Sequence, residues 1–194
     1  MSTIIKKIKE QNNYDFSRFN DNQIANVAHM ILEDFKVDSY PVPIVAIAEK
    51  LGFEIYGINI KSEVSGIIII DVDLINNYGT ETDKAIFINT NDNPGHRRFA
   101  LAHELGHYIF DFNETKDTRF YNAYLTTEKY GERAEEKRVN KFAAELLMPK
   151  EEFKEVYNSL KEKNDTIFEI VNTLTKYFAV SRTAIERRIV ELKL

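Results

Sequence analysis

The chain has 194 residues, of which 43% are hydrophobic and 12% aromatic, and this is enough apolar material for one sizeable core. It contains no cysteine, which excludes disulfide frameworks, thiol nucleophiles and cysteine-ligated metal sites. The formal net charge of −5 argues against a chain that binds nucleic acid over its whole surface. Any transition-metal site must therefore use carboxylates and the four histidines, His29, His96, His103 and His107.

Neither a signal peptide nor a membrane span is recognisable in the sequence. Residues 1–10 mix lysines with isoleucines and lack the apolar stretch of a secretory signal. The purest apolar run, residues 67–70, is far shorter than the roughly 20 residues that a membrane span needs. We therefore expect a cytoplasmic protein with no membrane partner.

The first half of the chain predicts two helices followed by strands. Residues 1–18 show little periodicity and are expected to form a loose N-terminal arm. Apolar residues at helical spacing predict helices over residues 20–35 and 44–51. Three short runs rich in β-branched side chains predict strands over residues 53–60, 66–71 and 85–89.

The second half of the chain is predicted to be helical. Residues 111–130 show no clean period and are expected to form an irregular connection. The remaining residues predict helices over 93–110, 132–147, 149–160, 166–177 and 181–192. The predicted fold class is therefore α+β, with a small sheet of about three strands packed by helices.

The clearest chemical signal is an HExxH motif, His103-Glu104-Leu105-Gly106-His107, inside the predicted helix 93–110. Residues four apart lie on the same helix face, so both imidazoles can reach one metal ion. Zinc lowers the pKa of a bound water to about 7, and Glu104 could take its proton during attack on a peptide carbonyl. The alternative, two surface histidines that happen to lie one turn apart, is disfavoured by the apolar residues that share their helix face.

A hydrolytic zinc site needs a third protein ligand and leaves the fourth position open. The extended motif with a third histidine is absent, because Asn113 occupies that position. The third ligand is therefore expected to be a carboxylate of the predicted helix 132–147. This leaves four candidates, Glu132, Glu135, Glu136 and Glu145.

The sequence resembles the ImmA/IrrE-type metallo-endopeptidases in two blocks, RRFALAHELGHY at residues 97–108 and NKFAAELLMP at residues 140–149. The second block is close to N-x-F-A-A-E-L-L-M-P and has no generic structural reason to recur beside an HExxH helix. Weaker matches extend the resemblance over roughly residues 20–150.

This resemblance implies a specific third ligand. In that family the metal-binding glutamate lies four residues before the asparagine of the second block, a position that Glu136 occupies here. Val139 replaces the usual alanine of the E-x-x-A-N pattern. Asn140, one turn after Glu136, would accept a hydrogen bond from an imidazole N–H and fix that ring. Glu132 and Glu135 remain as alternatives.

Other polar residues have weaker functional interpretations. A tyrosine of the connection could supply a phenol to a developing oxyanion, and the candidates are Tyr121, Tyr124 and Tyr130. The alternative is that these tyrosines only pack. His29 is expected to be a surface or boundary residue, and His96 a cap or surface residue. The strand 85–89, directly before the metal helix, could be an edge to which an extended substrate adds.

The last two predicted helices resemble a helix-turn-helix in miniature. Residues 171–194 carry five basic residues against two acidic ones, so the last helix could contact nucleic acid. The favoured alternative is a docking module that packs against the core or a partner. Its packing residues would be Leu174, Phe178, Ile185, Ile189 and Leu192.

The sequence thus predicts an N-terminal arm (1–18), a metallopeptidase domain (19–160) and a helical C-terminal module (161–194). The predicted function is that of an endopeptidase with one Zn²⁺, in which Glu104 is the general base. The resemblance implies that the substrate is a helix-turn-helix repressor, cleaved to relieve repression of a mobile element or a stress response. The alternatives are a non-proteolytic anti-repressor and a DNA-binding regulator that uses the C-terminal helices.

Overall fold

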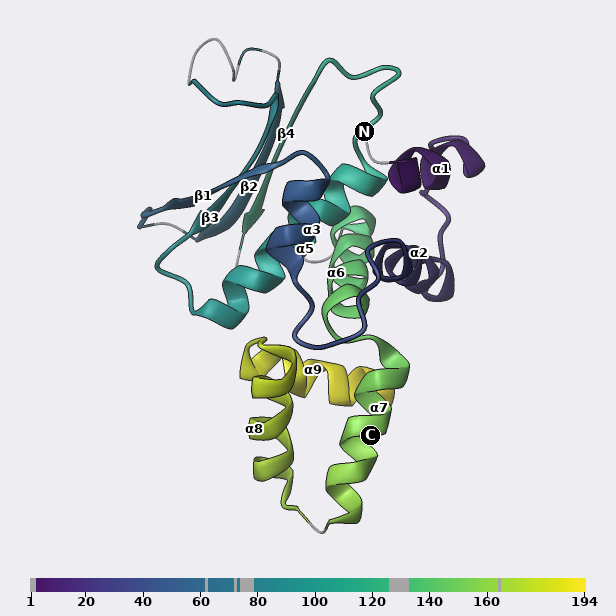
Figure 1. Ribbon diagram of the computed structural model, residues 1–194, viewed down its shortest axis with the longest axis vertical. Helices are drawn as coiled ribbons and strands as arrows, with labels where there is room; N and C mark the ends of the chain where they lie inside the picture. Colours follow the sequence, from purple (N-terminus) through teal and green to yellow (C-terminus); the bar gives the residue numbers. More distant parts are fainter. Residues whose placement is uncertain (1–2, 62, 72, 74–78, 126–132, 164) are drawn as a thin grey trace.

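The computed structural model describes residues 3–61, 63–71, 73, 79–125, 133–163 and 165–194. Its helices are α1 (Thr3–Gln11), α2 (Asp21–Asp34), α3 (Ile44–Lys50), α5 (Pro94–Phe110), α6 (Ala134–Leu147), α7 (Lys150–Glu162), α8 (Ile167–Phe178) and α9 (Arg182–Leu192). Its strands are β1 (Glu54–Ile58), β2 (Val64–Asp71), β3 (Lys84–Asn89) and β4 (Arg119–Leu125). Figure 1 shows the α+β fold that the sequence predicts. Among the described residues, no helix combines the length and apolar character needed to cross a bilayer.

The sheet has four strands in the order β1-β3-β2-β4, one more than expected. β3 runs parallel to β1 and antiparallel to β2, and β2 is also antiparallel to β4. The additional strand, β4, lies in the segment for which the sequence predicts an irregular connection. Its two faces both mix polar and apolar residues, so the alternation that identifies a half-buried strand is absent.

The strand expected to be a sheet edge is an inner strand. β3, which contains residues 85–89, lies between β1 and β2, and the parallel pairing with β1 was not visible from the sequence. β4 instead ends the described sheet on the side where it packs against α5. An extended substrate therefore cannot add to β3.

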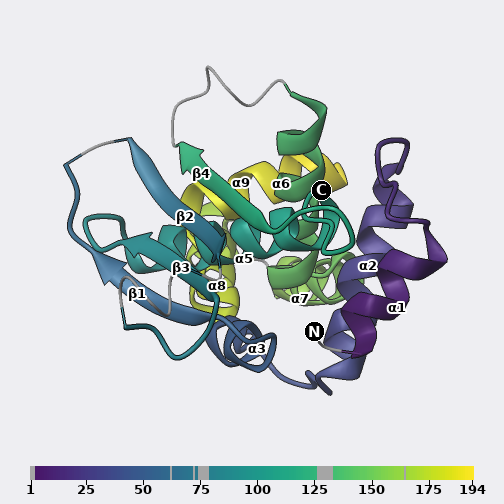
Figure 2. The same cartoon turned by 90° about the horizontal axis from the view of Figure 1, so that it is seen from above.

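Helix α5 is the centre of the molecule. It packs against the sheet on one side and against α6 on the other (Figures 1 and 2). Asn93 caps its start by accepting the N–H of His96 at 2.9 Å, and Pro94 occupies the first turn. Every residue from 100 to 110 is buried. Gly106 permits the close approach of α6, since a Cβ there would lie 3.0 Å from Cβ of Val139.

The N-terminal segment is a packed helix, so the loose arm expected over residues 1–18 is wrong as a description of its structure. The buried residues of α1 are Ile4, Ile5, Ile8 and Lys9. The Lys9 ammonium donates to the carbonyl oxygen of Phe112 at 2.7 Å and to Glu114 at 3.0 Å, and burial lowers its pKa. Three isoleucines among lysines are too short a pattern to show helical periodicity. The division into domains stays a prediction.

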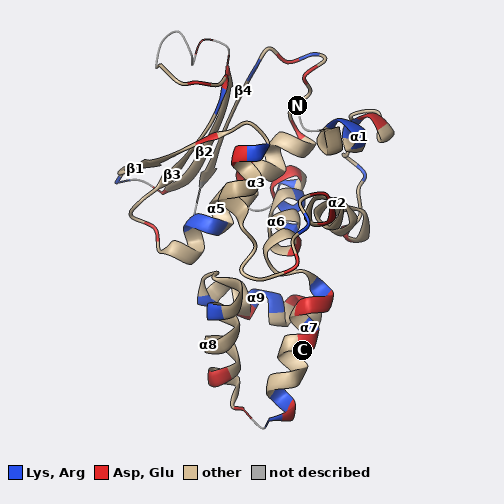
Figure 3. Cartoon of the chain, in the orientation of Figure 1, with Lys and Arg blue, Asp and Glu red and all other residues tan. Residues whose placement is uncertain are grey.

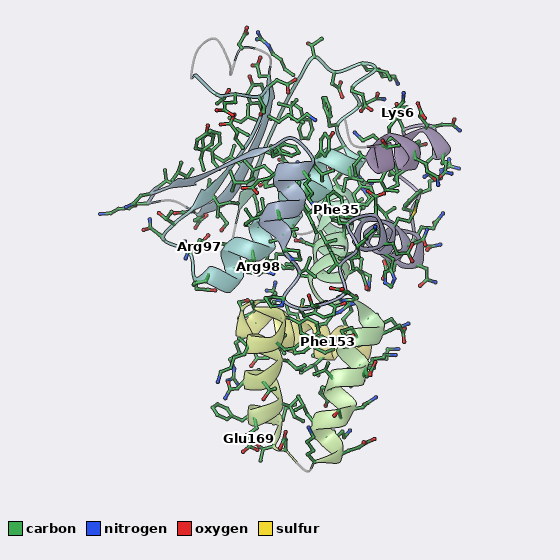
Figure 4. The ribbon with its side chains drawn as sticks, in the orientation of Figure 1. Lys6, Phe35, Arg97, Arg98, Phe153 and Glu169 are labelled. Atoms are coloured by element: carbon green, nitrogen blue, oxygen red, sulfur yellow. The ribbon has the colours of Figure 1, made fainter. Side chains whose placement is uncertain are left out.

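Helices α7, α8 and α9 form the end of the molecule away from the sheet (Figure 1). Phe153 of α7, labelled in Figure 4, stacks on Phe178 of α8 with ring centroids 5.4 Å apart. The apolar residues predicted to pack there are buried in the same cluster as the rest of the core, namely Leu174, Phe178, Ile185 and Ile189, with Leu192 packed against them. The predicted packing is confirmed.

A buried ion-pair network joins α9 to α6. Arg188, 1% exposed, donates to Glu145 at 2.8 Å, to Glu191 at 2.8 Å and to the carbonyl oxygen of Met148 at 2.9 Å. Lys141 pairs with Glu145 at 2.9 Å and also with Glu191. Removing one partner would leave an uncompensated buried charge. Arg188 is therefore unavailable to nucleic acid, which weakens the DNA-binding alternative.

Gly95→Ala is expected to loosen the C-terminal module. A Cβ at residue 95 would lie 2.4 Å from the backbone nitrogen of Ser181 and 2.4 Å from the carbonyl carbon of Val180, so backbone must move. We expect a loss of about 1–2 kcal/mol in the free energy of unfolding, after the gain in helix propensity is subtracted. Denaturant titration measures it, and a variant as stable as the wild type would show that the α8–α9 turn moves at no cost.

Candidate metal centre

Three side chains from two helices converge beside the sheet. The Nε2 atoms of His103 and His107, both on α5, lie 3.0 Å apart. Glu136, near the start of α6, places its carboxylate oxygens 3.3 Å from Nε2 of His103 and 3.6 Å from Nε2 of His107. One ligand atom from each residue lies within 4.8 Å of the other two. Two imidazoles and one carboxylate are a donor set of hydrolytic zinc sites.

The other glutamates considered for the third ligand are placed differently. Glu135 is exposed on α6. Glu145 is buried, but its oxygens are held by Lys141 and Arg188. Glu132 lies outside the described residues. Glu136 is therefore the carboxylate that the described structure brings to the histidine pair.

Each histidine of the pair has an oxygen partner on its outer ring nitrogen. Nδ1 of His103 lies 2.9 Å from Oδ1 of Asn140, and Nδ1 of His107 lies 2.6 Å from Oδ2 of Asp111. A proton on each Nδ1 leaves the Nε2 lone pairs directed at the cluster. Asp111 is also paired with Arg138. Asp111 was not among the site residues predicted from the sequence, although its position four residues after His107 was a usable signal.

The charge states of the cluster suit a cation. Burial lowers the pKa of His103, which keeps the imidazole neutral, as a metal ligand must be. Burial alone would raise the pKa of Glu136, but the two neighbouring histidines, His103 and His107, hold it below its usual value. Glu136 is therefore an ionised carboxylate beside the Nε2 atoms of both histidines, and its negative charge would attract a metal cation.

Glu104 lies fully buried beside the cluster. Its Oε1 accepts the backbone N–H of Tyr124 at 3.1 Å. Its Oε2 has no hydrogen-bond partner among the described residues, and burial raises the pKa of the carboxyl well above its usual value. A buried carboxylate oxygen without a partner is rare in folded proteins. The orphaned oxygen and the neighbouring donor set together fit a metal ion with its water.

Of the three tyrosines considered, Tyr124 lies beside the cluster. Its ring packs over the ring of His103, with centroids 4.0 Å apart. Tyr121 is 57% exposed and bonds Asp71 through its hydroxyl, on the opposite side of β4 from Tyr124. Tyr130 lies outside the described residues. A phenol donor role for Tyr124 stays a prediction.

The family model of the IrrE N-terminal-like domain, peptidase family M78, matches residues 54–190. This is well over half of the chain, and it includes the HExxH helix and Glu136. The chain belongs to this metallopeptidase family. The ImmA/IrrE resemblance is thereby confirmed. No curated protein matches the chain at a significant level.

In this M78 metallopeptidase a cleft of about 560 Å³ opens beside the cluster, between α5, β4, α6 and α9. Tyr124 and Asn140, which both contact His103, form part of its wall. His96 also lines the cleft, 2.9 Å from Oγ of Ser65 and 22% exposed. His96 therefore lies in the capped first turn of α5 and is half-buried, between β2 and β4.

Proposed function

We propose that the chain is a zinc-dependent endopeptidase that hydrolyses a peptide bond in a specific protein substrate. One observation carries the proposal. The ligand atoms of His103, His107 and Glu136 lie within 4.8 Å of one another, beside a buried Glu104 with an unpartnered oxygen. The family supports peptide-bond hydrolysis as the reaction class.

His103, His107 and Glu136 would hold one zinc ion, because two imidazoles and a carboxylate are donors that suit zinc. Bound zinc supplies Lewis-acid activation of the attacking water and of the scissile carbonyl. Asn140 and Asp111 keep the two imidazole rings in the orientation that directs Nε2 to the cluster.

Glu104 acts as the general base. It takes a proton from the attacking water and passes it to the amide nitrogen that leaves, so no covalent intermediate with the chain forms. The backbone N–H of Tyr124 holds Oε1 of Glu104 in place, so Oε2 is the oxygen that accepts and then donates the proton. A carboxylate of raised pKa is also a stronger base than an exposed one.

Gly66→Ala is expected to reduce kcat with little change in stability. A Cβ at residue 66 would lie 2.9 Å from Oε1 of Glu104, so the carboxyl must move while the flexible side chain relieves the contact. A displacement of this kind costs about tenfold or more in rate, and zinc content should not change. Gly57→Ala is the matched control, because its Cβ would meet Thr90 Cγ2 at 2.9 Å, away from Glu104. An equal loss in both variants would contradict the assignment.

As the substrate we propose a helix-turn-helix repressor in the cytoplasm, on the resemblance to ImmA/IrrE-type peptidases. Cleavage would relieve repression of a mobile element or a stress response. The test is co-expression with any helix-turn-helix repressor encoded beside this gene, and a repressor fragment should appear with the wild type and not with Glu104→Gln. Relief of repression by Glu104→Gln would instead support a non-proteolytic anti-repressor.

A further inference from the structure

One wall of the cleft beside the metal cluster comes from the C-terminal module. Thr183 and Arg187 of α9 and its N-cap residue Ser181 line it, opposite residues of α5 and α6. This wall is held in place, because α9 is joined to α6 by buried ion pairs and the turn before α9 packs on Gly95 of α5. A peptide that reaches the cluster along this cleft therefore contacts α9.

The cleft carries unbalanced positive charge. Two of its cations, Lys141 and Arg188, are neutralised by the carboxylates of Glu145 and Glu191. Its other two cations, Lys137 and Arg187, are exposed and have no ion pair within the described part of the chain. Figure 3 shows the basic residues of α9 below the N-terminal part of α5.

Arg187 lines the same cleft as His96 and Tyr124. Burial lowers the pKa of His96, and the charge of Arg187 lowers it further. His96 and Tyr124 have ring centroids 5.9 Å apart, and the Tyr124 ring lies on His103. Oδ2 of Asp92 lies 3.8 Å from Nε2 of His96 on the same side of the cleft. The guanidinium of Arg187 has no ion pair among the described residues and shares the cleft with Tyr124, whose ring packs on the ligand His103.

Apolar side chains also line the cleft that contains these cations, and they include Phe99, Ala144 and Met148. We infer that Arg187 and Lys137 form a subsite for an acidic side chain of the peptide substrate, next to an apolar residue near the scissile bond. Charge-assisted hydrogen bonds from a guanidinium to a carboxylate give such a subsite its selectivity. The inference rests on the proposed function and adds to it the class of peptide that the cleft accepts.

A binding selection tests the subsite apart from catalysis. The full-length Glu104→Gln protein, loaded with zinc, is used to select short peptides from a random phage-displayed library. We expect Asp and Glu to be enriched among the selected peptides. The enrichment should be lost when Arg187→Glu or Arg187→Gln is added. It should persist with Lys176→Glu, a matched change on α8 at an exposed residue outside the cleft.

Synthetic peptides make the test quantitative. A selected peptide should bind about tenfold more tightly than the same peptide with its acid replaced by the amide, and Arg187→Glu should remove this difference. Failure to select peptides, absence of acid enrichment, or enrichment that survives Arg187→Glu would each overturn the inference. The inference would also be overturned if Arg187→Glu lost binding to duplex DNA but kept the peptide selectivity of the wild type.

The selected peptides also separate this inference from the proposed function. They are incubated with the zinc-loaded wild-type protein, and cleavage is followed by mass spectrometry. Acid-selective binding without cleavage would contradict the peptidase and leave the subsite standing. Cleavage with no preference for peptides that contain an acidic residue would support the peptidase and contradict the subsite.

Discussion

Glu104→Gln should reduce peptide hydrolysis by about three orders of magnitude and leave the zinc content unchanged. The amide keeps the shape of the carboxyl, and its oxygen can still accept the N–H of Tyr124. It cannot take a proton from water, so general-base catalysis is lost. Glu104 is not one of the three converging ligands, so metal binding should persist. Cleavage rate and zinc per chain, measured by atomic absorption, are the two readouts.

The stability of the metal-free variant is the control for its fold. Burial raises the pKa of Glu104 well above 4.5, so the folded protein binds this proton more tightly than the unfolded chain. Stability therefore falls as pH rises above that usual value toward the raised one. Glutamine does not ionise and avoids this loss. Metal-free Glu104→Gln should thus be at least as stable as the metal-free wild type at neutral pH. If Glu104→Gln lost zinc together with activity, this would argue against a role of Glu104 as the general base.

Glu136→Ala should weaken zinc binding by at least about a hundredfold. Loss of an outer hydrogen-bond partner already costs 10–100-fold in metal affinity, and loss of a ligand itself should exceed that. Competition with a chelating dye measures the affinity. Activity at limiting zinc should fall in parallel.

Glu135→Ala is the matched control for Glu136→Ala. It removes the same charge from the neighbouring position of α6, where the side chain is exposed. Its zinc affinity should equal that of the wild type. If Glu136→Ala also bound zinc like the wild type, the third ligand would lie elsewhere, and Glu132 would be the next residue to substitute.

The histidine pair could be predicted from the sequence because its geometry is local. Residues four apart on a helix share a face whatever the rest of the chain does, so His103 and His107 needed no tertiary information. Glu136 lies on another helix, and spacing alone left four glutamates open. The family resemblance selected it, and the structure places its carboxylate against both histidines.

The features that could not be predicted depend on long-range pairing. β4 becomes a strand by pairing with β2, far away in the sequence, and its own residues show no alternation. Arg187 and His96 share one cleft because the turn before α9 packs back on α5, a contact between residues about ninety positions apart. The apolar residues of this module were recognisable in the sequence, but the surface that they cover was not.

The complete burial of residues 100–110 determines how the metal would enter and leave. We expect the backbone amides of this segment to exchange with solvent only when the whole fold opens, and the histidine backbone to keep its place without the ion. Glu136 lies near the more exposed start of α6, and its side chain is 12% exposed. The ion would thus load through a local movement of that turn, unlike domains that fold only around their metal. A chelator would then inhibit the peptidase reversibly, because the metal-free chain would stay folded and could bind zinc again.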